Sequence, residues 1–480
     1  MTDYDQFDMT GLAQLVRKGD VTPTELLDAA LRRMEDVNGA LTAVVVSAED
    51  EARRRIAKGL PDGAFQGVPF LLKDMGCEAV GYPAHEGSRL MAGSTYPVDS
   101  HLFARLAATG LVPFGRTAAP ENGIGVATEA AAYGSPTRNP WDLDRTPGGS
   151  SGGSGAAVAA GIVPGAHGSD GGGSIRIPAS NCHLFGFKAT RGRLPDGPYS
   201  GEGWGGLAIE GFLTRSVRDT AALLDASMGP DVGAPYHAPP LKRSLTEVLL
   251  SPPKTLRIAV CDTRLDGTPI SRGPRDAVAG AAVLLDDMGH DVSDARPKAD
   301  HQGMMRAWCD IVASGVLAST EAELTRLGRP LHEDDLEPLG RAAMAHARTL
   351  SGADYLNALS TIHRYGREMA AFFEDWDVLL TPTLAEPPAQ IGRFAHDHDD
   401  FLAYRLGPGM CFDYSPYTAA FNATGQPAMS VPFAIEDGLP IGVHLAGRFG
   451  EDDTLISLAA DIERARPWDH LRAPLAPPQK

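Results

Sequence analysis

Two glycine- and serine-rich segments, separated by a short apolar run, constrain this chain more than any other feature. They span residues 146–155 and 167–174, and the alanine-rich run 156–160 lies between them. Glycine lets the backbone approach another backbone or a ligand closely, but it costs conformational entropy on folding. A flexible linker does not explain the pattern, because good helix formers fill the intervening run. We therefore expect two ordered loops in which the backbone itself has a task.

The composition is that of a globular protein and excludes several classes of function. Of 480 residues, 43% are hydrophobic and 22% are charged, which is enough apolar material for a large core. The formal net charge of −18 argues against a nucleic-acid partner, which needs a basic surface. No window approaches the length of about eighteen apolar residues that a membrane span needs, and the N-terminus lacks a signal-peptide pattern. We expect a cytoplasmic protein that has neither a membrane nor a nucleic-acid partner.

The cysteines indicate neither a metal site nor a disulfide framework. They are odd in number, widely scattered and without C-x-x-C spacing. Their pattern suits a reducing compartment. The residues are Cys77, Cys182, Cys261, Cys309 and Cys411.

Helical and strand patterns alternate along the chain without an intervening linker. This alternation favours one α/β domain over residues 1–480. Thr22 and Glu25 flank Pro23 as a capping box at the start of a helix. An apolar strand over 67–73 ends in Lys73, residues 300–375 are mostly helical in pattern, and residues 422–432 resemble a strand.

Two familiar explanations of the glycine-rich loops fit poorly. A phosphate cradle needs G-x-x-x-x-G-K-[ST] or G-x-G-x-x-G, and neither pattern is present. Residues 148–152 match the G-x-S-x-G elbow of α/β-hydrolases, but no apolar strand precedes them and no HGGG-type motif lies upstream. In a chain with 54 glycines, that short match is weak evidence. Acyl transfer by a serine that uses a lysine as its base is the remaining explanation.

Four segments, in the right order, resemble the amidase signature family. They are residues 67–74, 134–142, 148–161 and 168–179. The resemblance covers nearly the whole chain. It implies an α/β amidase signature fold, a large mixed β-sheet with helices on both faces. The signature core lies at about residues 65–220 and a helical substrate-side region at about residues 300–375.

The resemblance also implies a catalytic site that elementary chemistry supports. A serine hydroxyl is a weak nucleophile until a base takes its proton, and a lysine can be that base when desolvation lowers its pKa. Lys73 follows an apolar run and satisfies this condition. By resemblance, the roles are Lys73 as base, Ser150 as bridging serine on a cis peptide, and Ser174 as nucleophile. The amides of Gly171, Gly172, Gly173 and Ser174 form the oxyanion hole, and Asp170, Arg176 and Ser151 support the loops.

We expect a hydrolase of C–N bonds in linear or cyclic amides that forms an acyl-enzyme and needs no cofactor or metal. Family members also hydrolyse carbamates, urethanes and aryl acylamides, and one type is a glutaminase subunit that needs partner chains. These alternatives stay open, as does the choice between monomer and homodimer. Segments 26–29, 328–335 and 421–428 resemble the nylon-oligomer hydrolases of the family.

The substrate pocket is expected in loops that vary within the family. We place it among residues 120–135, 199–210, 305–320 and 400–415. Cys309 lies on a helix that, by resemblance, lines the acyl pocket, so it is either part of the pocket wall or an ordinary buried thiol. The family pattern Thr-Asn-x-Pro-Glu is Thr117-Ala-Ala-Pro-Glu121 here, so the rim of the site is expected to lack one amide side chain.

Overall fold

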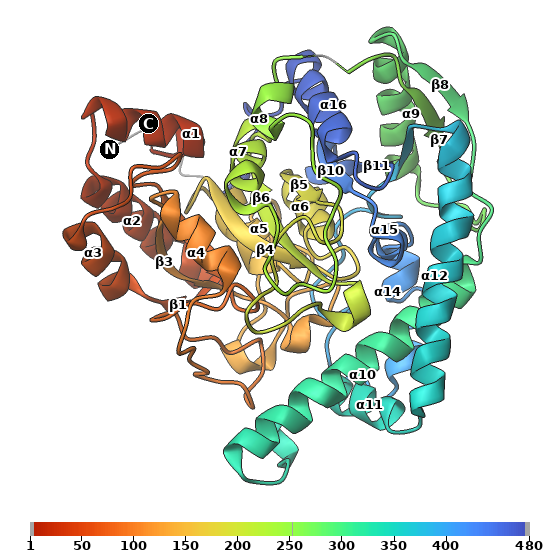
Figure 1. Ribbon diagram of the computed structural model, residues 1–480, viewed down its shortest axis with the longest axis horizontal. Helices are drawn as coiled ribbons and strands as arrows, with labels where there is room; N and C mark the ends of the chain where they lie inside the picture. The colour runs from red at the N-terminus through yellow and green to blue at the C-terminus, as the bar shows by residue number, and fades with distance from the viewer. Residues whose placement is uncertain (1–3, 252, 476–480) are drawn as a thin grey trace.

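The computed structural model describes residues 4–251 and 253–475, and within them one mixed sheet of 11 strands runs through the molecule (Figure 1). The strand order is β1-β3-β2-β4-β6-β5-β10-β11-β9-β7-β8. Strand β2 is parallel to β3 and β4, strand β7 is parallel to β8 and β9, and the other pairs are antiparallel. The strands are β1 (Val44–Ser47), β2 (Pro69–Lys73), β3 (Val112–Thr117), β4 (Gly165–Asp170), β5 (Phe185–Lys188), β6 (Ile209–Thr214), β7 (Arg257–Val260), β8 (Asp291–Asp294), β9 (Val378–Pro382), β10 (Ala428–Glu436) and β11 (Leu439–Gly447).

Helices cover the central strands. Strands β2, β3, β5, β9 and β11 are buried at every position, so side chains on both of their faces are packed against other elements. The helices are α1 (Met9–Lys18), α2 (Pro23–Leu41), α3 (Glu49–Lys58), α4 (His101–Ala108), α5 (Gly152–Ala159), α6 (Arg176–Cys182), α7 (Val217–Ser227), α8 (Leu245–Val248), α9 (Arg272–Asp287), α10 (His301–Leu327), α11 (Pro338–Ala347), α12 (Gly352–Asp375), α13 (Phe401–Leu406), α14 (Cys411–Tyr414), α15 (Thr418–Thr424) and α16 (Asp452–Ala465). This arrangement confirms the expected α/β fold.

Helices α10, α11 and α12 pack on one another and extend away from the sheet (Figure 1). Their apolar side chains belong to a second hydrophobic core that also includes α13 to α15. This core is separate from the larger one under α2, α7 and α16. Trp308 of helix α10 belongs to the second core and also contacts the glycine-rich loop after β4. The Trp308 indole nitrogen donates to the Gly171 carbonyl at 2.9 Å.

Local sequence signals predicted several element boundaries correctly. Helix α2 begins at Pro23, and its capping box between Thr22 and Glu25 is present. Strand β2 ends at Lys73 as expected. The strand predicted over 422–432 is wrong in its first half, because residues up to Thr424 continue helix α15 and the strand begins only at Ala428. The left-handed Gly425 ends that helix before the strand.

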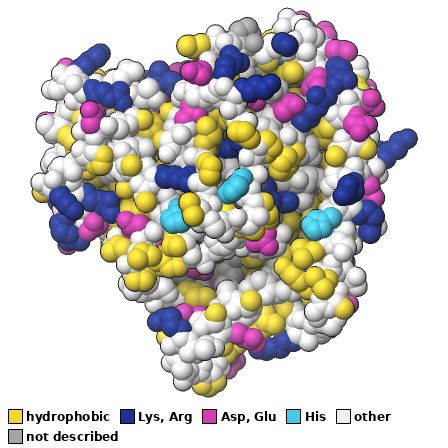
Figure 2. Space-filling model, viewed as in Figure 1, with side chains coloured by type: hydrophobic (Ala, Val, Ile, Leu, Met, Phe, Trp, Pro, Cys, Tyr) yellow, Lys and Arg dark blue, Asp and Glu magenta, His cyan; other side chains and the backbone are white. Residues whose placement is uncertain are grey.

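Two observations concern membrane-spanning helices and the distribution of surface charge. Among the described residues, no helix is long and apolar enough to cross a membrane. On the face shown in Figure 2, Lys and Arg side chains are scattered among acidic and apolar ones and do not gather into one basic patch.

Candidate active site

The sheet brings Lys73 beside the second glycine-rich loop. Strands β2 and β4 are parallel neighbours, with Leu71 opposite Ala166. Their carboxyl ends therefore lie at the same edge of the sheet, where Lys73 ends β2 and Asp170 ends β4. The first glycine-rich loop reaches the same edge because helix α5, which begins at Gly152, packs against β4 and β2.

Lys73 is hydrogen-bonded to two serine hydroxyls. Its side chain is fully buried, and its Nζ donates to Ser150 Oγ at 2.7 Å and to Ser169 Oγ at 2.9 Å. Ser169 was not among the predicted site residues. The sequence did carry a signal for it: the amidase signature pattern Gly-Thr-Asp is Gly168-Ser-Asp170 here, which keeps a hydroxyl side chain at position 169.

The neutral form of the Lys73 amine is more favourable in this buried site than it would be in water. Burial lowers the pKa of Lys73 to about 8, although the negative charges of Glu210, Asp170 and Glu86 oppose this shift. Within the described residues, no carboxylate forms an ion pair with Lys73. A lysine with a pKa near the working pH can accept a proton.

Backbone hydrogen bonds join the two glycine-rich loops. The Ser151 amide donates to the Ser174 carbonyl at 3.1 Å, and the Ser151 hydroxyl both donates to the Ser169 carbonyl and accepts from its amide. These hydrogen bonds connect Ser151 to both loops. The peptide bond between Gly149 and Ser150 is cis.

Asp170 and Arg176 form a buried ion pair beneath the second loop. Arg176 donates to both carboxylate oxygens of Asp170, at 2.8 and 2.9 Å, and both side chains are fully buried. Burial opposes ionisation of Asp170, but the Arg176 guanidinium and the Asn422 amide hold its pKa well below its ordinary value. The pair therefore braces the loop and does not face the reaction.

The amides predicted for the oxyanion hole differ in their hydrogen bonding. The Gly173 amide donates to Asp170 Oδ1 at 2.8 Å, so this amide is already used within the loop. In the described part of the chain, the amides of Gly171, Gly172 and Ser174 have no protein acceptor. Side chains from other elements stabilise this loop. The Thr418 hydroxyl donates to the Gly172 carbonyl at 2.6 Å, and the Trp308 indole donates to the Gly171 carbonyl.

Comparison with known proteins agrees with this geometry. The model of the amidase family matches residues 25–456. The chain belongs to the amidase signature family. It is 37% identical to 6-aminohexanoate-cyclic-dimer hydrolase of Paenarthrobacter ureafaciens, over 98% of this chain and 97% of the relative. The amidase is therefore a hydrolase that cleaves amide C–N bonds.

Two solved structures have the same fold. The structure of a 6-aminohexanoate cyclic dimer hydrolase complexed with substrate superposes with a TM-score of 0.93 at 36% identity, covering 98% of this amidase and 99% of that chain. A bacterial aryl acylamidase of the same family superposes with a TM-score of 0.85 at 30% identity, covering 96% and 97% of the two chains. These likenesses agree with the resemblance to nylon-oligomer hydrolases seen in the sequence.

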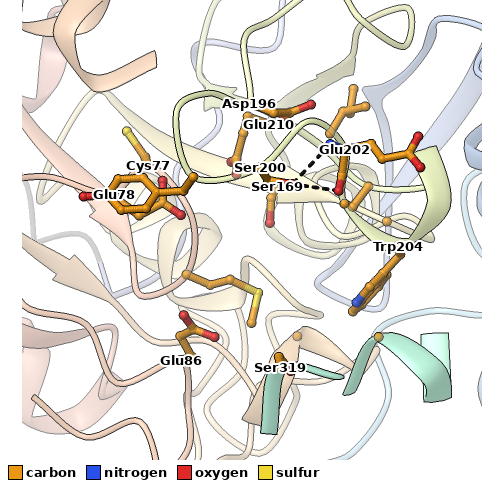
Figure 3. Close-up of a pocket in the computed structure, with 18 of the residues that line it drawn as sticks. Cys77, Glu78, Glu86, Ser169, Asp196, Ser200, Glu202, Trp204, Glu210 and Ser319 are labelled. Carbon is orange, nitrogen blue, oxygen red and sulfur yellow. Dashed lines mark hydrogen bonds between the residues drawn. The ribbon is translucent and has the colours of Figure 1, made fainter. Parts of the chain in front are cut away.

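The amidase has a cavity of about 660 Å³ that opens onto both Ser150 and Ser174 (Figure 3). This volume is typical of small-molecule sites. Residues from three of the expected segments, 120–135, 199–210 and 305–320, line it. Several residues between positions 75 and 102 also line it and were missed; they are Met75, Cys77, Glu78, Glu86, Ser100 and Leu102. A smaller hollow of about 20 Å³ adjoins Ser174 on another side and is lined by Trp308, Arg405 and Phe412.

The prediction that Cys309 lines the substrate pocket is not supported. Its thiol is fully buried within the second core, where burial raises its pKa to about 12, and it lines neither the cavity nor the hollow. Successive helical residues point about 100° apart, so Trp308, the residue before it on α10, lines the hollow instead.

Histidines near the loops do not form a catalytic triad with Ser174. His167 is fully buried, accepts from the Lys73 amide at Nδ1 and pairs with Glu210 through Nε2 at 2.6 Å. The acceptor role of Nδ1 puts the proton of the neutral ring on Nε2. Among the described residues, no cluster of three or more His, Cys, Asp or Glu side chains could hold a metal ion.

Proposed function

We propose that this amidase works through an acyl-enzyme on Ser174, with Ser150 as a proton relay and Lys73 as the base. The observation that carries the proposal is the 2.7 Å hydrogen bond between Lys73 Nζ and Ser150 Oγ, in a buried setting that lowers the lysine pKa to about 8. Ser150 and Ser174 line the same cavity, which supports a relay between them.

Acylation begins when Ser174 Oγ attacks the carbonyl carbon of the substrate amide. The Ser174 proton passes to Ser150, and Ser150 passes its own proton to neutral Lys73. The tetrahedral intermediate collapses by breaking the C–N bond, and the departing nitrogen takes the proton back from Lys73 through Ser150. The products of this half-reaction are a free amine and an ester of the acyl group with Ser174.

The amides of Gly171, Gly172 and Ser174 stabilise the negative oxygen of the intermediate. They have no other acceptor, whereas the Gly173 amide already donates to Asp170. The role of Gly173 is then to shape the loop. Removal of one such donor costs about 3–4 kcal/mol of transition-state stabilisation in serine hydrolases.

Water completes the cycle. It loses a proton through Ser150 to Lys73 and attacks the ester carbonyl. The new tetrahedral intermediate collapses by breaking the bond to Ser174 Oγ, which takes the proton back from Lys73 through Ser150 as the carboxylic acid leaves. The steps need only these side chains, the loop amides and water, so we propose catalysis without a cofactor. The continuous sheet from β1 to β8 supports one catalytic domain over residues 1–480.

The similarity to 6-aminohexanoate-cyclic-dimer hydrolase supports a linear or cyclic aliphatic amide as substrate. The likeness to an aryl acylamidase favours a second candidate, an anilide. A carbamate or urethane fits the same chemistry, because its carbonyl carbon is also bonded to nitrogen. A glutaminase subunit that needs partner chains is the remaining alternative.

The experiment is to incubate the purified chain with anilides, nylon oligomers, carbamates and primary amides, and to identify products by mass. Ser174→Ala is expected to abolish turnover while the protein stays folded, and Ser360→Ala, at an exposed serine of α12, leaves it unchanged. Full activity of Ser174→Ala would exclude the proposed nucleophile. Hydrolysis by the purified chain alone would exclude an obligate partner subunit.

A further inference from the structure

The cavity that opens onto Ser174 is lined by acidic side chains. Its lining residues in the described chain include no Lys, Arg or His. Figure 3 shows the carboxylates around one common space. They are Glu78, Glu86, Asp196, Glu202 and Glu210.

Two of these five carboxylates have partners within the protein. Glu210 pairs with His167 at 2.6 Å, and Glu202 accepts from the Tyr236 hydroxyl. For the other three, the described residues provide no side-chain hydrogen bond and no ion pair. These three, the acid triplet, are Glu78, Glu86 and Asp196.

No nearby basic group of the described chain neutralises the acid triplet. Arg116 acts on Glu78 and Glu86 at a distance, but it is fully buried and donates to the backbone carbonyls of Lys73, Gly76, Cys77 and Tyr82. Lys73 does not line the cavity, and its amine is bonded to Ser150 and Ser169, which do. The acid triplet is half-buried, so its charges are only partly solvated and favour a cation in the cavity over a neutral group.

The pKa values of two members of the acid triplet are raised, as expected for carboxylates without a basic partner. Burial and the neighbouring carboxylates Asp74 and Glu78 raise the pKa of Glu86 to about 7. Burial, with Glu210 and Asp231 nearby, raises the pKa of Asp196 to about 7. A cation placed between them would favour their ionised forms.

Asn122 provides an independent sign of a ligand in the same cavity. It is only 6% exposed and lines the cavity, and its Nδ2 has no acceptor. Its backbone amide donates to the Glu86 carbonyl at 3.0 Å, which ties it to the acid triplet. On its other side, a Cβ added at Gly123 would lie 3.5 Å from Ser150 Oγ, so Asn122 is next to the reacting groups. A buried amide donor without an acceptor indicates a missing carbonyl or carboxyl oxygen.

We propose that the substrate is an amide that carries an ammonium group, which the acid triplet binds while Asn122 donates to an oxygen of the same molecule. This inference rests on the proposed function of Ser174. An ammonium group has three donors and one positive charge, which suits a cavity whose wall carries carboxylates and, in the described chain, no basic side chain. Leu102, Val316 and Trp204 line the cavity as well, so the link between the ammonium and the amide is an apolar chain.

The test compares matched amides that differ by one charge, since the ammonium can lie on either side of the scissile bond. The first pair is 6-aminohexanoyl p-nitroanilide and hexanoyl p-nitroanilide. The second pair is N-acetyl-1,6-diaminohexane and N-acetylhexylamine. We expect kcat/KM for the cationic member to exceed that of the neutral member at least about tenfold in one pair, as for a partly desolvated charge pair. Equal or higher kcat/KM for the neutral member of both pairs would overturn the proposal.

Isosteric variants assign the preference to the acid triplet. Glu86→Gln and Asp196→Asn are each expected to reduce the cationic-to-neutral ratio of kcat/KM about fivefold or more. The ratio is used because a change in the Lys73 pKa on loss of the Glu86 charge affects both substrates alike. Asp50→Asn, at an exposed position of α3, removes the same charge outside the cavity and leaves the ratio unchanged. A ratio that stays the same in both cavity variants, or falls equally in Asp50→Asn, would contradict the proposal.

Binding separates this inference from the proposed function. The Ser174→Ala variant is titrated with N-acetyl-1,6-diaminohexane and with N-acetylhexylamine by calorimetry. Tighter binding of the diamine derivative, by about tenfold and less at high salt, supports the acid triplet whichever residue is the nucleophile. Equal binding of the two compounds would overturn the inference even if Ser174 is the nucleophile.

Discussion

The side-chain nitrogen of Lys73 lies 2.7 Å from the hydroxyl oxygen of Ser150, at the end of a buried parallel strand. This hydrogen bond connects the proposed base, which ends β2, with the proposed relay serine, which lies in a loop far along the sequence. Helix α5, which follows Ser150, packs against the paired strands β2 and β4 and so brings the serine to Lys73. The predictions below depend on this geometry.

The activity is expected to rise with pH through about 8. The pKa of Lys73 is lowered to about 8, and only its neutral form, which predominates above that pH, accepts the Ser150 proton. The measurement is kcat/KM from pH 6 to 10 on a neutral substrate, so that ionisation of the acid triplet contributes little. A pH-independent kcat/KM over this range would contradict the role of Lys73. Lys73→Met serves as the inactive control.

Gly173→Ala is expected to damage both folding and activity. Gly173 has a φ of +129°, and an added Cβ would lie 2.4 Å from Thr418 Oγ1. We expect the free energy of unfolding to fall by about 1–3 kcal/mol, and kcat to fall about a hundredfold because the loop amides shift. Gly366→Ala, in an open position of helix α12, is expected to be neutral or stabilising by up to about 1 kcal/mol. If urea unfolding gave the same change in the free energy of unfolding for Gly173→Ala and Gly366→Ala, the special role of the Gly173 backbone would be refuted.

Arg176→Met is expected to lower the free energy of unfolding by about 3–5 kcal/mol. The substitution leaves the Asp170 carboxylate buried without its partner. The double variant Arg176→Met with Asp170→Asn removes that unpaired charge and is expected to recover part of the loss. Urea unfolding at neutral pH measures both. A loss below about 1 kcal/mol in the single variant would show that the pair does not brace the loop.

Asn122→Gly is expected to lower kcat/KM about tenfold without loss of stability. The Asn122 φ is +53°, which glycine adopts without strain, so the change removes the amide donor and little else. The expected split is a higher KM with a smaller change in kcat, because the amide binds the substrate and does not move protons. Unchanged kinetics with cationic and neutral amides would exclude Asn122 from substrate binding.

The parts of the site that sequence reasoning found are those encoded in contiguous residues. Lys73, Ser150 and Ser174 lie in long ordered motifs, and the strand before Lys73 has the apolar run of a buried strand. The capping box at Thr22 similarly fixes where α2 begins. Each of these signals is local, so a single sequence reveals it.

The parts that were missed depend on tertiary packing. Glu78 and Glu86 sit in irregular loops without periodicity, and only the fold brings them into one cavity. The rim was expected to lose an amide near Thr117, yet Asn122 supplies one from a few residues further along. Sequence reasoning left open whether Cys309 is a pocket wall or an ordinary buried thiol, because only the packing of α10 shows that its thiol lies in the second core. The use of the Gly173 amide by Asp170 likewise needs three-dimensional geometry.

The most direct test of the account is to trap the acyl-enzyme. The purified enzyme is mixed with an excess of a reactive anilide, quenched in acid within the first turnover and digested, and the peptides are analysed by mass spectrometry. The account predicts the added mass of the acyl group on the peptide that contains Ser174, and no adduct in Ser174→Ala. An acyl group on another residue, or the same adduct in Ser174→Ala, would contradict it.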